Sequence, residues 1–487
     1  MSPPPRRDAT GASLMRFELS PPEAVEQFHD AARQALEAEG ELTAALRATL
    51  AGHARQLGVH PYDEAVALRH VRALPSVQAA FAAAAERRFE GARLEATLQA
   101  ARPGSEVVLE RGTYRLDSPL VVSRALTLAG AGHDRTRVVC ASGECVLRLE
   151  SDGPVVVRGI SFEHEGDAAA DVVVVSAGPA RLEDCRFTGA TADALGKRGR
   201  GLAVFSAGPV EVVSCLAVGN RRTGIQVDGA ARASVRDSYA AENGGSGIAF
   251  HATSAGSVEG NTCERNAFHG IAASGAPALT VARNVCVYND RGGIELAGSA
   301  SGAVRENSCA DNGRDGIRVA GEARPVLAAN RCAANRASGV AFVEGGRGEA
   351  RDNRCAGNQR HGITVERRAT PLLEANACEE NRGAGIGYQG SARGTARGNQ
   401  CRANLADGIL VDGRAAPALE ENECTGNRDS GIRWAGTARG VARGNRCEGN
   451  LYGLSIGERA SPDPGKDNQC RGNRFADVFD ARGAAGP

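Results

Sequence analysis

The stretch NTCERNAFHGIAA, residues 261–273, decides the fold because its pattern returns at a fixed distance along the chain. It returns as NVCVYNDRGGIEL at residues 284–296 and as NSCADNGRDGIRV at residues 307–319. The three stretches share Asn-x-Cys-x-x-Asn-x-x-x-Gly-Ile and begin 23 residues apart. A period of this size indicates a solenoid, in which each repeat stacks on the next and buries a continuous core.

Cysteine marks the same period through the second half of the chain. Each of ten cysteines stands 23 residues after the previous one, with Asn two residues before it and Asn three residues after it. The ten are Cys263, Cys286, Cys309, Cys332, Cys355, Cys378, Cys401, Cys424, Cys447 and Cys470. The frame extends back to Asn220, with Ala240 in the cysteine position. The regular array therefore covers residues 220–475.

Each repeat contains a segment with the period of a β-strand. In Gly-Ile-x-Val segments alternate residues point to opposite faces, so Ile294 and Leu296 are expected in the core and Glu295 in solvent. Stacked Asn side chains at the turns can bond to their counterparts one strand spacing away. The pattern predicts a parallel β-helix of about sixteen coils between residues 103 and 475, roughly 75 Å long.

Two parts of the sequence resemble known β-helix families. EVVLERGTYRL at residues 106–116, followed by LTLAGAG at residues 126–132, resembles the opening coils of the pectate-lyase-like superfamily. The 23-residue unit resembles the repeats of carbohydrate-binding proteins and sugar hydrolases, including NosD-type proteins. The resemblance covers about residues 103–475. It implies an all-β, right-handed parallel β-helix and does not specify a chemistry.

The remaining sequence completes the domain organisation. Residues 20–101 have helical spacing, with a helix start at Ser20 and further helices expected at about 41–58, 61–73 and 75–101. This small α-helical domain is expected to cap the first coil or to form a second interaction module. The expected divisions are a disordered segment 1–19, the helical domain 20–101, irregular first coils 102–219, regular coils 220–475 and a tail 476–487.

Composition excludes some classes of partner. Lys plus Arg and Asp plus Glu are both 58, so no net field attracts nucleic acid or an acidic membrane. No apolar run has the length of a signal-peptide core or of a membrane span. We therefore expect a cytoplasmic protein with no nucleic-acid partner and no membrane span.

The cysteine ladder permits two hypotheses. A row of thiols could bind a soft metal, but no His or second Cys stands within two to four residues of any of the ten, as a zinc site would require. Cysteine is also a small residue that is often buried, and Ala240 takes its position in one coil. We interpret the ladder as core filler and expect neither a metal nor a cofactor.

The outward face of the Gly-Ile-x-Val strands carries the candidate catalytic residues. Asp228, His251, Glu295 and Arg318 fall on successive or nearby coils of this face. They could supply an acid/base pair and a cation for a sugar carboxylate. The alternative is a solvated strand face, which must carry some charges in any case.

The motifs of three enzyme families are incomplete in this chain. His269 and His361 each precede the repeat glycine, and a His-Gly pair occurs in polygalacturonase-like enzymes, but the chain has no Asp-Asp pair. Asp463-Pro-Gly-Lys-Asp467 lacks the His of the alginate-epimerase-like motif Asp-Pro-His-Asp. The pectate-lyase motif Arg-x-Pro-x-x-Arg is missing as well. The position before the repeat glycine is therefore interpreted as a variable turn position.

Two functions follow as hypotheses. The first is a non-catalytic scaffold that binds a protein or a carbohydrate along the outward strand face, favoured by coils of uniform length. The alternative is a polysaccharide-active lyase, hydrolase or epimerase, for which the irregular loop 189–201, with Lys197, Arg198 and Arg200, could wall a cleft. Metal delivery by the thiols is a third possibility with less support.

Overall fold

The computed structural model describes residues 21–39, 44–59, 61–77, 88–194 and 196–483. The chain divides into two compact units, Met1–Glu86 and Arg87–Pro487. Residues 87–101, which the sequence pattern assigns to the helical domain, therefore belong to the unit of the solenoid. The expected disordered segment 1–19 and the helix start at Ser20 lie outside the described residues.

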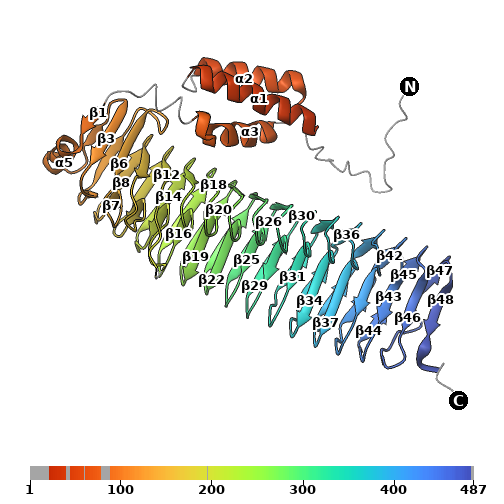
Figure 1. The fold of residues 1–487 in the computed structure, drawn as a ribbon. Helices are drawn as coiled ribbons and strands as arrows, with labels where there is room; N and C mark the ends of the chain where they lie inside the picture. The colour runs from red at the N-terminus through yellow and green to blue at the C-terminus, as the bar shows by residue number, and fades with distance from the viewer. Residues whose placement is uncertain (1–20, 40–43, 60, 78–87, 195, 484–487) are drawn as a thin grey trace. The chain divides into compact units, whose positions relative to one another are not determined.

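The first unit contains the helices α1 (Pro22–Glu39), α2 (Ala44–Leu57) and α3 (Pro61–Ala73), drawn in red in Figure 1. Phe28, Ala32 and Leu36 recur every four residues on one face of α1 and are fully buried, together with Val71 of α3. Three of the expected helices are thus confirmed. No helix in the described part of the chain is both long and apolar enough to cross a bilayer.

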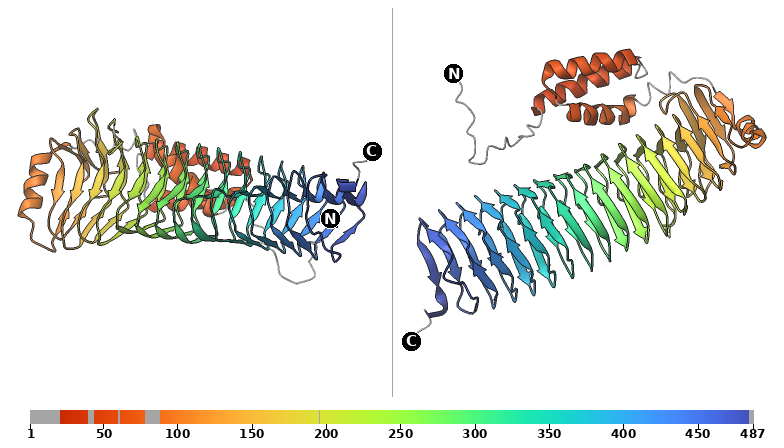
Figure 2. Two further views of the ribbon diagram at one scale, coloured as in Figure 1. Left: turned by 90° about the horizontal axis from the view of Figure 1, so that it is seen from below. Right: turned by 180° about the vertical axis from the view of Figure 1, so that it is seen from behind.

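The second unit is a solenoid of three parallel sheets, whose strands stack side by side from β1 to β48 (Figures 1 and 2). The 17-stranded sheet contains β1 (Arg88–Glu90), β3 (Gly112–Leu116), β6 (Thr136–Cys140), β9 (Ser161–His164), β12 (Arg186–Thr188), β15 (Leu216–Val218), β18 (Tyr239–Ala241), β21 (Thr262–Glu264), β24 (Val285–Val287), β27 (Ser308–Ala310), β30 (Arg331–Ala333), β33 (Arg354–Ala356), β36 (Ala377–Glu379), β39 (Gln400–Arg402), β42 (Glu423–Thr425), β45 (Arg446–Glu448) and β47 (Gln469–Arg471).

The 16-stranded sheet holds the Gly-Ile-x-Val segments. Its strands are β4 (Leu120–Val122), β7 (Leu147–Leu149), β10 (Val173–Val175), β13 (Leu202–Val204), β16 (Ile225–Val227), β19 (Ile248–Ala252), β22 (Ile271–Gly275), β25 (Ile294–Leu296), β28 (Ile317–Val319), β31 (Val340–Phe342), β34 (Ile363–Arg367), β37 (Ile386–Gly390), β40 (Ile409–Val411), β43 (Ser430–Trp434), β46 (Tyr452–Ile456) and β48 (Ala476–Asp480).

The 15-stranded sheet closes each coil. Its strands are β2 (Glu106–Val108), β5 (Leu126–Ala129), β8 (Val155–Arg158), β11 (Ala180–Glu183), β14 (Pro209–Val213), β17 (Arg232–Arg236), β20 (Ala255–Glu259), β23 (Ala278–Ala282), β26 (Ser301–Arg305), β29 (Arg324–Ala328), β32 (Glu349–Arg351), β35 (Leu372–Glu374), β38 (Thr395–Arg397), β41 (Ala418–Glu420) and β44 (Val441–Arg443).

Register follows the 23-residue repeat. Cys286 pairs with Cys309 and Ile294 with Ile317, so equivalent residues of successive coils lie side by side. In the first coils the spacing is longer, because Val173 pairs with Leu202, 29 positions later. The 23-residue coils expected from the sequence are confirmed.

The inside of the solenoid is filled as the strand alternation predicts. Ile294, Ile317 and Val319 are fully buried, whereas Glu295 and Arg318 between them are partly exposed. All fourteen cysteines are free thiols, and of the ten in the ladder only Cys470, in the last coil, is not fully within the core. The core position of the ladder is therefore confirmed.

Two ladders of buried asparagines stabilise the turns. The Nδ2 atom of Asn289 donates to Asn312 Oδ1 (3.0 Å) and to the Cys263 carbonyl (3.1 Å), and the backbone N–H of Asn289 donates to the same Oδ1 (3.1 Å). The residue before each ladder asparagine turns the chain sharply: Tyr288 has φ of 55° and Arg283 has φ of 53°. The ladder thus satisfies backbone groups that a left-handed turn removes from the sheets.

The repeat glycine is required by a close approach between coils. A Cβ on Gly293 would lie 2.7 Å from the Gly316 carbonyl oxygen and 2.8 Å from Cys309 Cβ. Glycine, asparagine and cysteine of the repeat therefore form one packed corner. Any side chain at the glycine position would separate the neighbouring coils.

The two ends of the solenoid differ. Helix α5 (Gly91–Ala100) buries Leu94 and Leu98 against the first coils, and β1 before it pairs with β3. Of the expected helix 75–101, residues 75–77 are helical, residues 88–100 form a strand and the shorter helix α5, and residues 78–87 lie outside the described residues. At the other end, Val478 pairs with buried Leu454 but is 58% exposed.

Candidate functional site

The outward face of the 16-stranded sheet carries polar side chains in three columns. One column precedes the repeat glycine, as at His269 and Asp315. The second lies between the two inward residues, as at Glu295 and Arg318. The third follows the second inward residue, as at Asp228. Because equivalent residues stack in register, each column runs along the solenoid with one side chain per coil.

Glu295 and Arg318 are direct partners on adjacent strands β25 and β28. The Nε atom of Arg318 lies 3.5 Å from Oε1 of Glu295. Burial raises the pKa of the Glu295 carboxyl despite the neighbouring guanidinium of Arg318, which lowers it. The structure thus brings together two of the four residues that the sequence analysis selected.

His269 holds the other oxygen of this carboxylate. Its Nε2 atom lies 3.2 Å from Oε2 of Glu295, and its Nδ1 atom accepts the backbone N–H of Gly292 at 3.2 Å. An acceptor at Nδ1 places the ring proton on Nε2, the nitrogen that faces Glu295. Burial, reinforced by Arg291 and other nearby arginines, lowers the pKa of His269 to about 4, so the imidazole is neutral at pH 7.

Asp315 completes what we call the Glu295 cluster: His269, Glu295, Asp315 and Arg318. The Asp315 Oδ2 atom lies 3.7 Å from Nη1 of Arg318, and its Oδ1 accepts the backbone N–H of Ser338 at 3.0 Å. Burial raises the pKa of this carboxyl too. Two partly buried carboxyl groups therefore flank one guanidinium on the outward face.

Asp228 and His251 form a separate pair. They occupy the third column on neighbouring coils, and His251 Nδ1 lies 2.6 Å from the Ser274 hydroxyl. Burial lowers the pKa of His251, and the Asp228 charge opposes the shift. Three coil steps, about 14 Å, separate β16, which ends just before Asp228, from β25, which contains Glu295. The four selected residues thus lie on one face as two pairs.

Sequence reasoning did not select His269 and Asp315, because they occupy a position interpreted as a variable turn. That position also has a structural role, since His269 and Asp315 each accept the backbone N–H of a residue in the turn of the next coil. The sequence feature that could have predicted this contact is the spacing of 26 residues between His269 and Glu295, which equals one coil of 23 residues plus three. It places the two side chains in adjacent columns on adjacent coils.

The irregular loop 189–201 is anchored by Arg200. Its Nε and Nη2 atoms donate to the two carboxylate oxygens of Asp171 at 2.9 and 2.7 Å. Arg200 also lies 5.2 Å from the ring centre of Phe205, an exposed aromatic residue of the third column. This loop therefore borders the outward face one coil before Asp228.

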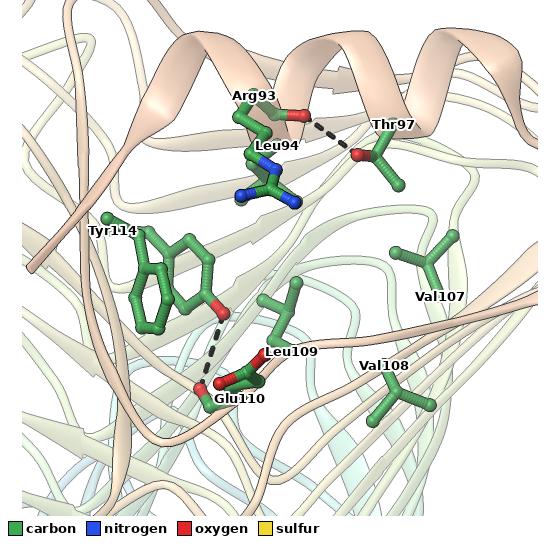
Figure 3. Close-up of a pocket in the computed structure, with 9 residues that line it drawn as sticks. Arg93, Leu94, Thr97, Val107, Val108, Leu109, Glu110 and Tyr114 are labelled. Carbon is green, nitrogen blue, oxygen red and sulfur yellow. Dashed lines mark hydrogen bonds between the residues drawn. The ribbon is translucent and has the colours of Figure 1, made fainter. Parts of the chain in front are cut away.

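A pocket of about 200 Å³ lies elsewhere, between α5 and the first strands (Figure 3). Arg93, Leu94, Val107, Val108 and Tyr114 are among its lining residues. The Tyr114 hydroxyl donates to the Glu110 carbonyl at 3.4 Å. Among the described residues, no three His, Cys, Asp or Glu side chains are grouped so that they could hold a metal ion.

A family model described as "Right handed beta helix region" matches residues 140–286 and 280–411, more than half of the chain. The chain belongs to this right-handed β-helix family. No curated protein matches the sequence.

Several solved structures are similar to this chain at low identity. The A-module of the mannuronan C-5 epimerase AlgE4 from Azotobacter vinelandii is 15% identical with a TM-score of 0.34, covering 82% of this chain and 93% of that one. The periplasmic alginate epimerase AlgG is 14% identical with a TM-score of 0.37, covering 80% and 87%. The catalytic domain of a GH87 alpha-1,3-glucanase is 12% identical with a TM-score of 0.33, covering 74% and 64%. At these identities the similarity concerns the fold alone.

Proposed function

We propose that the outward face of the 16-stranded sheet binds a polysaccharide with carboxylate groups and acts on it through Glu295. The observation that carries the proposal is the position of the Glu295 carboxylate, between His269 Nε2 at 3.2 Å and Arg318 Nε at 3.5 Å. A carboxyl group with a raised pKa, held by a neutral donor and a cation, is equipped for proton transfer.

Each member of the Glu295 cluster has a role in this proposal. Arg318 neutralises the carboxylate of the bound sugar, and Glu295 exchanges a proton with the carbon or oxygen that reacts. Asp315 supplies a second carboxyl group beside Arg318, as hydrolysis of a glycosidic bond would require. Asp228, His251 and the exposed ring of Phe205 lie farther along the face and contact more distant sugars of the polymer.

A non-catalytic scaffold is the second candidate, and one observation favours it. The charges of the Glu295 cluster are paired with one another, so the cluster also serves as a structural network that joins adjacent coils. In this case the face binds a polymer or a protein without changing it.

Turnover assays separate the two candidates. Wild type and Glu295→Gln are incubated with alginate, polygalacturonate and a neutral glucan. A lyase forms an unsaturated end together with each new reducing end, a hydrolase forms reducing ends without unsaturation, and an epimerase changes the sugar configuration seen by NMR. We expect turnover of a uronate polymer by wild type and a loss of at least about 100-fold in Glu295→Gln, in line with the range for general acid–base catalysis.

The matched control is Glu374→Gln, which removes a half-exposed carboxylate from the 15-stranded sheet. This variant should keep full turnover. Binding of a uronate polymer without turnover, equal in wild type and Glu295→Gln, would support the scaffold and exclude the catalytic role of Glu295.

A further inference from the structure

A second histidine repeats the arrangement of His269 four coils later. The Nδ1 atom of His361 accepts the backbone N–H of Ala384 at 2.9 Å, which places the ring proton on Nε2, as in His269. His361 is buried, with an exposed fraction of 7%. In the described part of the chain no side chain or backbone group bonds to its Nε2 atom, and this atom is not among the buried polar atoms that lack a partner, so it is open to solvent.

The residue that faces this donor differs between the two places. Glu295 follows His269 by 26 positions, and the residue 26 positions after His361 is Gly387. The imidazole ring of His361 covers Gly387, since a Cβ there would be 3.0 Å from both Nε2 and Cδ2 and 3.1 Å from Cγ of the ring. At His269 this position holds the carboxylate of Glu295, whereas at His361 it is a glycine without a side chain.

A cation borders the same place. Arg360 stands where the first site has Phe268, and its Nη2 atom lies 2.7 Å from Gln389 Oε1 and 2.5 Å from Glu366 Oε1. These contacts hold the Arg360 guanidinium on the outward face, beside the third-column residues Glu366 and Gln389. Both use Nη2, and the side chain is 46% exposed, so further N–H donors of Arg360 point to solvent.

Hydroxyl and amide groups complete the surroundings. The Ser338 and Thr364 hydroxyls lie 2.7 Å apart beside His361, and Gln389 follows Gly387 on β37. Ser338 and Thr364 are fully buried and bond to each other, so the partly exposed Gln389 amide is the group that a sugar hydroxyl can bond.

We infer that the outward surface at His361 Nε2, bordered by Arg360 and Gln389, is a binding subsite for the carboxylate of one uronate residue of the polymer. The ligand carboxylate accepts from His361 Nε2, and the exposed guanidinium of Arg360, which also pairs with Glu366, offers it a positive charge. The inference rests on the proposed function and adds to it a second anchor, four coil steps or about 19 Å from the Glu295 cluster.

The first test introduces a carboxylate into the protein itself, at the place where the ligand carboxylate is proposed to bind. Gly387→Glu introduces a carboxylate beside His361; Gly387 is not in the left-handed region, but a Cβ there lies 3.0 Å from the His361 ring, so the ring has to shift slightly. Binding of hexamers of galacturonate and of mannuronate is measured by titration calorimetry. We expect wild type to bind at least one of the two kinds of hexamer. The Gly387→Glu variant should bind the same hexamer at least tenfold more weakly.

Further variants keep the test independent of a local distortion. Arg360→Gln should also weaken binding at least tenfold, and binding of the methyl-esterified hexamer should not depend on Arg360. Arg354→Gln is the matched control, because Arg354 is exposed on the 17-stranded sheet in the same coil. Melting temperatures establish that each variant is folded.

The outcomes separate this inference from the proposed function. Equal binding by wild type, Gly387→Glu and Arg360→Gln, or no binding of either hexamer, would overturn the subsite. If the Gly387→Glu and Arg360→Gln variants lose binding while Glu295→Gln keeps full turnover, the subsite stands and the role of Glu295 is wrong. If Glu295→Gln alone is inactive and all variants bind equally, the role of Glu295 stands and the subsite is wrong.

Discussion

The Nε2 atom of His269 lies 3.2 Å from Oε2 of Glu295, and this contact joins two coils of the solenoid. The same imidazole accepts a backbone N–H from the next coil through Nδ1. A neutral ring serves both contacts, since protonation would place a second hydrogen against the N–H of Gly292. The charge state of His269 is therefore linked to the stability of the fold.

The first prediction concerns pH. The pKa of His269 is about 4 in the folded protein and 6.5 as the ordinary value. Between these values the unfolded chain binds more protons, so the histidine makes stability fall as pH decreases from 6.5 to 4, by up to about 1.4 kcal/mol per pH unit. The free energy of unfolding of His269→Gln, measured in urea, should depend less on pH in this window than that of wild type.

The comparison with wild type is needed because other groups titrate in the same window. Burial raises the pKa of Asp407 to about 6, which makes its contribution rise as pH falls. Both proteins contain Asp407, so it cancels in the difference. Identical pH profiles for the two proteins would show that His269 is not buried as a neutral ring.

The second prediction tests the inward face. Ile317 is fully buried between Ile294 and Val340 of the adjacent strands. Ile317→Asp should lower the free energy of unfolding by at least about 4 kcal/mol, because an unpaired charge enters an apolar core. Circular dichroism during thermal unfolding measures the loss. Arg324→Asp, at an exposed position of the 15-stranded sheet, should melt like wild type.

The third prediction uses the left-handed turns. Ala329 has φ of 53°, a conformation that costs an alanine about 1–2 kcal/mol. Ala329→Gly should therefore raise the free energy of unfolding by roughly 0.5 kcal/mol after the greater entropy of glycine in the unfolded chain is included. Ala350→Gly, buried on β32, should lower it. Chemical denaturation resolves the two signs, and a loss of stability in both variants would contradict the turn geometry.

The fourth prediction concerns a hydroxyl in the core. The Tyr388 side chain is fully buried, and its hydroxyl has no hydrogen-bond partner among the described residues. Tyr388→Phe should leave the free energy of unfolding unchanged or raise it by about 1 kcal/mol, since a buried unpaired polar group is unfavourable. The contrast is Tyr239→Phe, which loses a 2.8 Å bond to the Glu264 carboxylate and should lose about 1.5–3 kcal/mol. Similar effects of the two variants would show that the Tyr388 hydroxyl is satisfied.

Sequence reasoning recovered what repeats along the chain. The 23-residue coil, the inward and outward positions and the place of the cysteines all follow from one period, because every coil must satisfy the same packing. It did not recover the left-handed conformation of Arg283 or Tyr288, since neither residue type prefers it and the asparagine that follows imposes it. The contact of His269 with Glu295 was also missed, because it depends on the register between coils rather than on residues close in sequence.

The unequal ends of the solenoid set the direction in which it comes apart. An inner coil is held on two sides, whereas a terminal coil is held on one, so loss of structure begins where the smallest number of contacts must break. Leu94 and Leu98 of α5 close the first coil, while Val478 of the last coil is exposed and Asp480 continues its strand beside buried Ile456. Backbone amide protons should therefore exchange with solvent fastest in the coils nearest β48, and more slowly in coils farther from it.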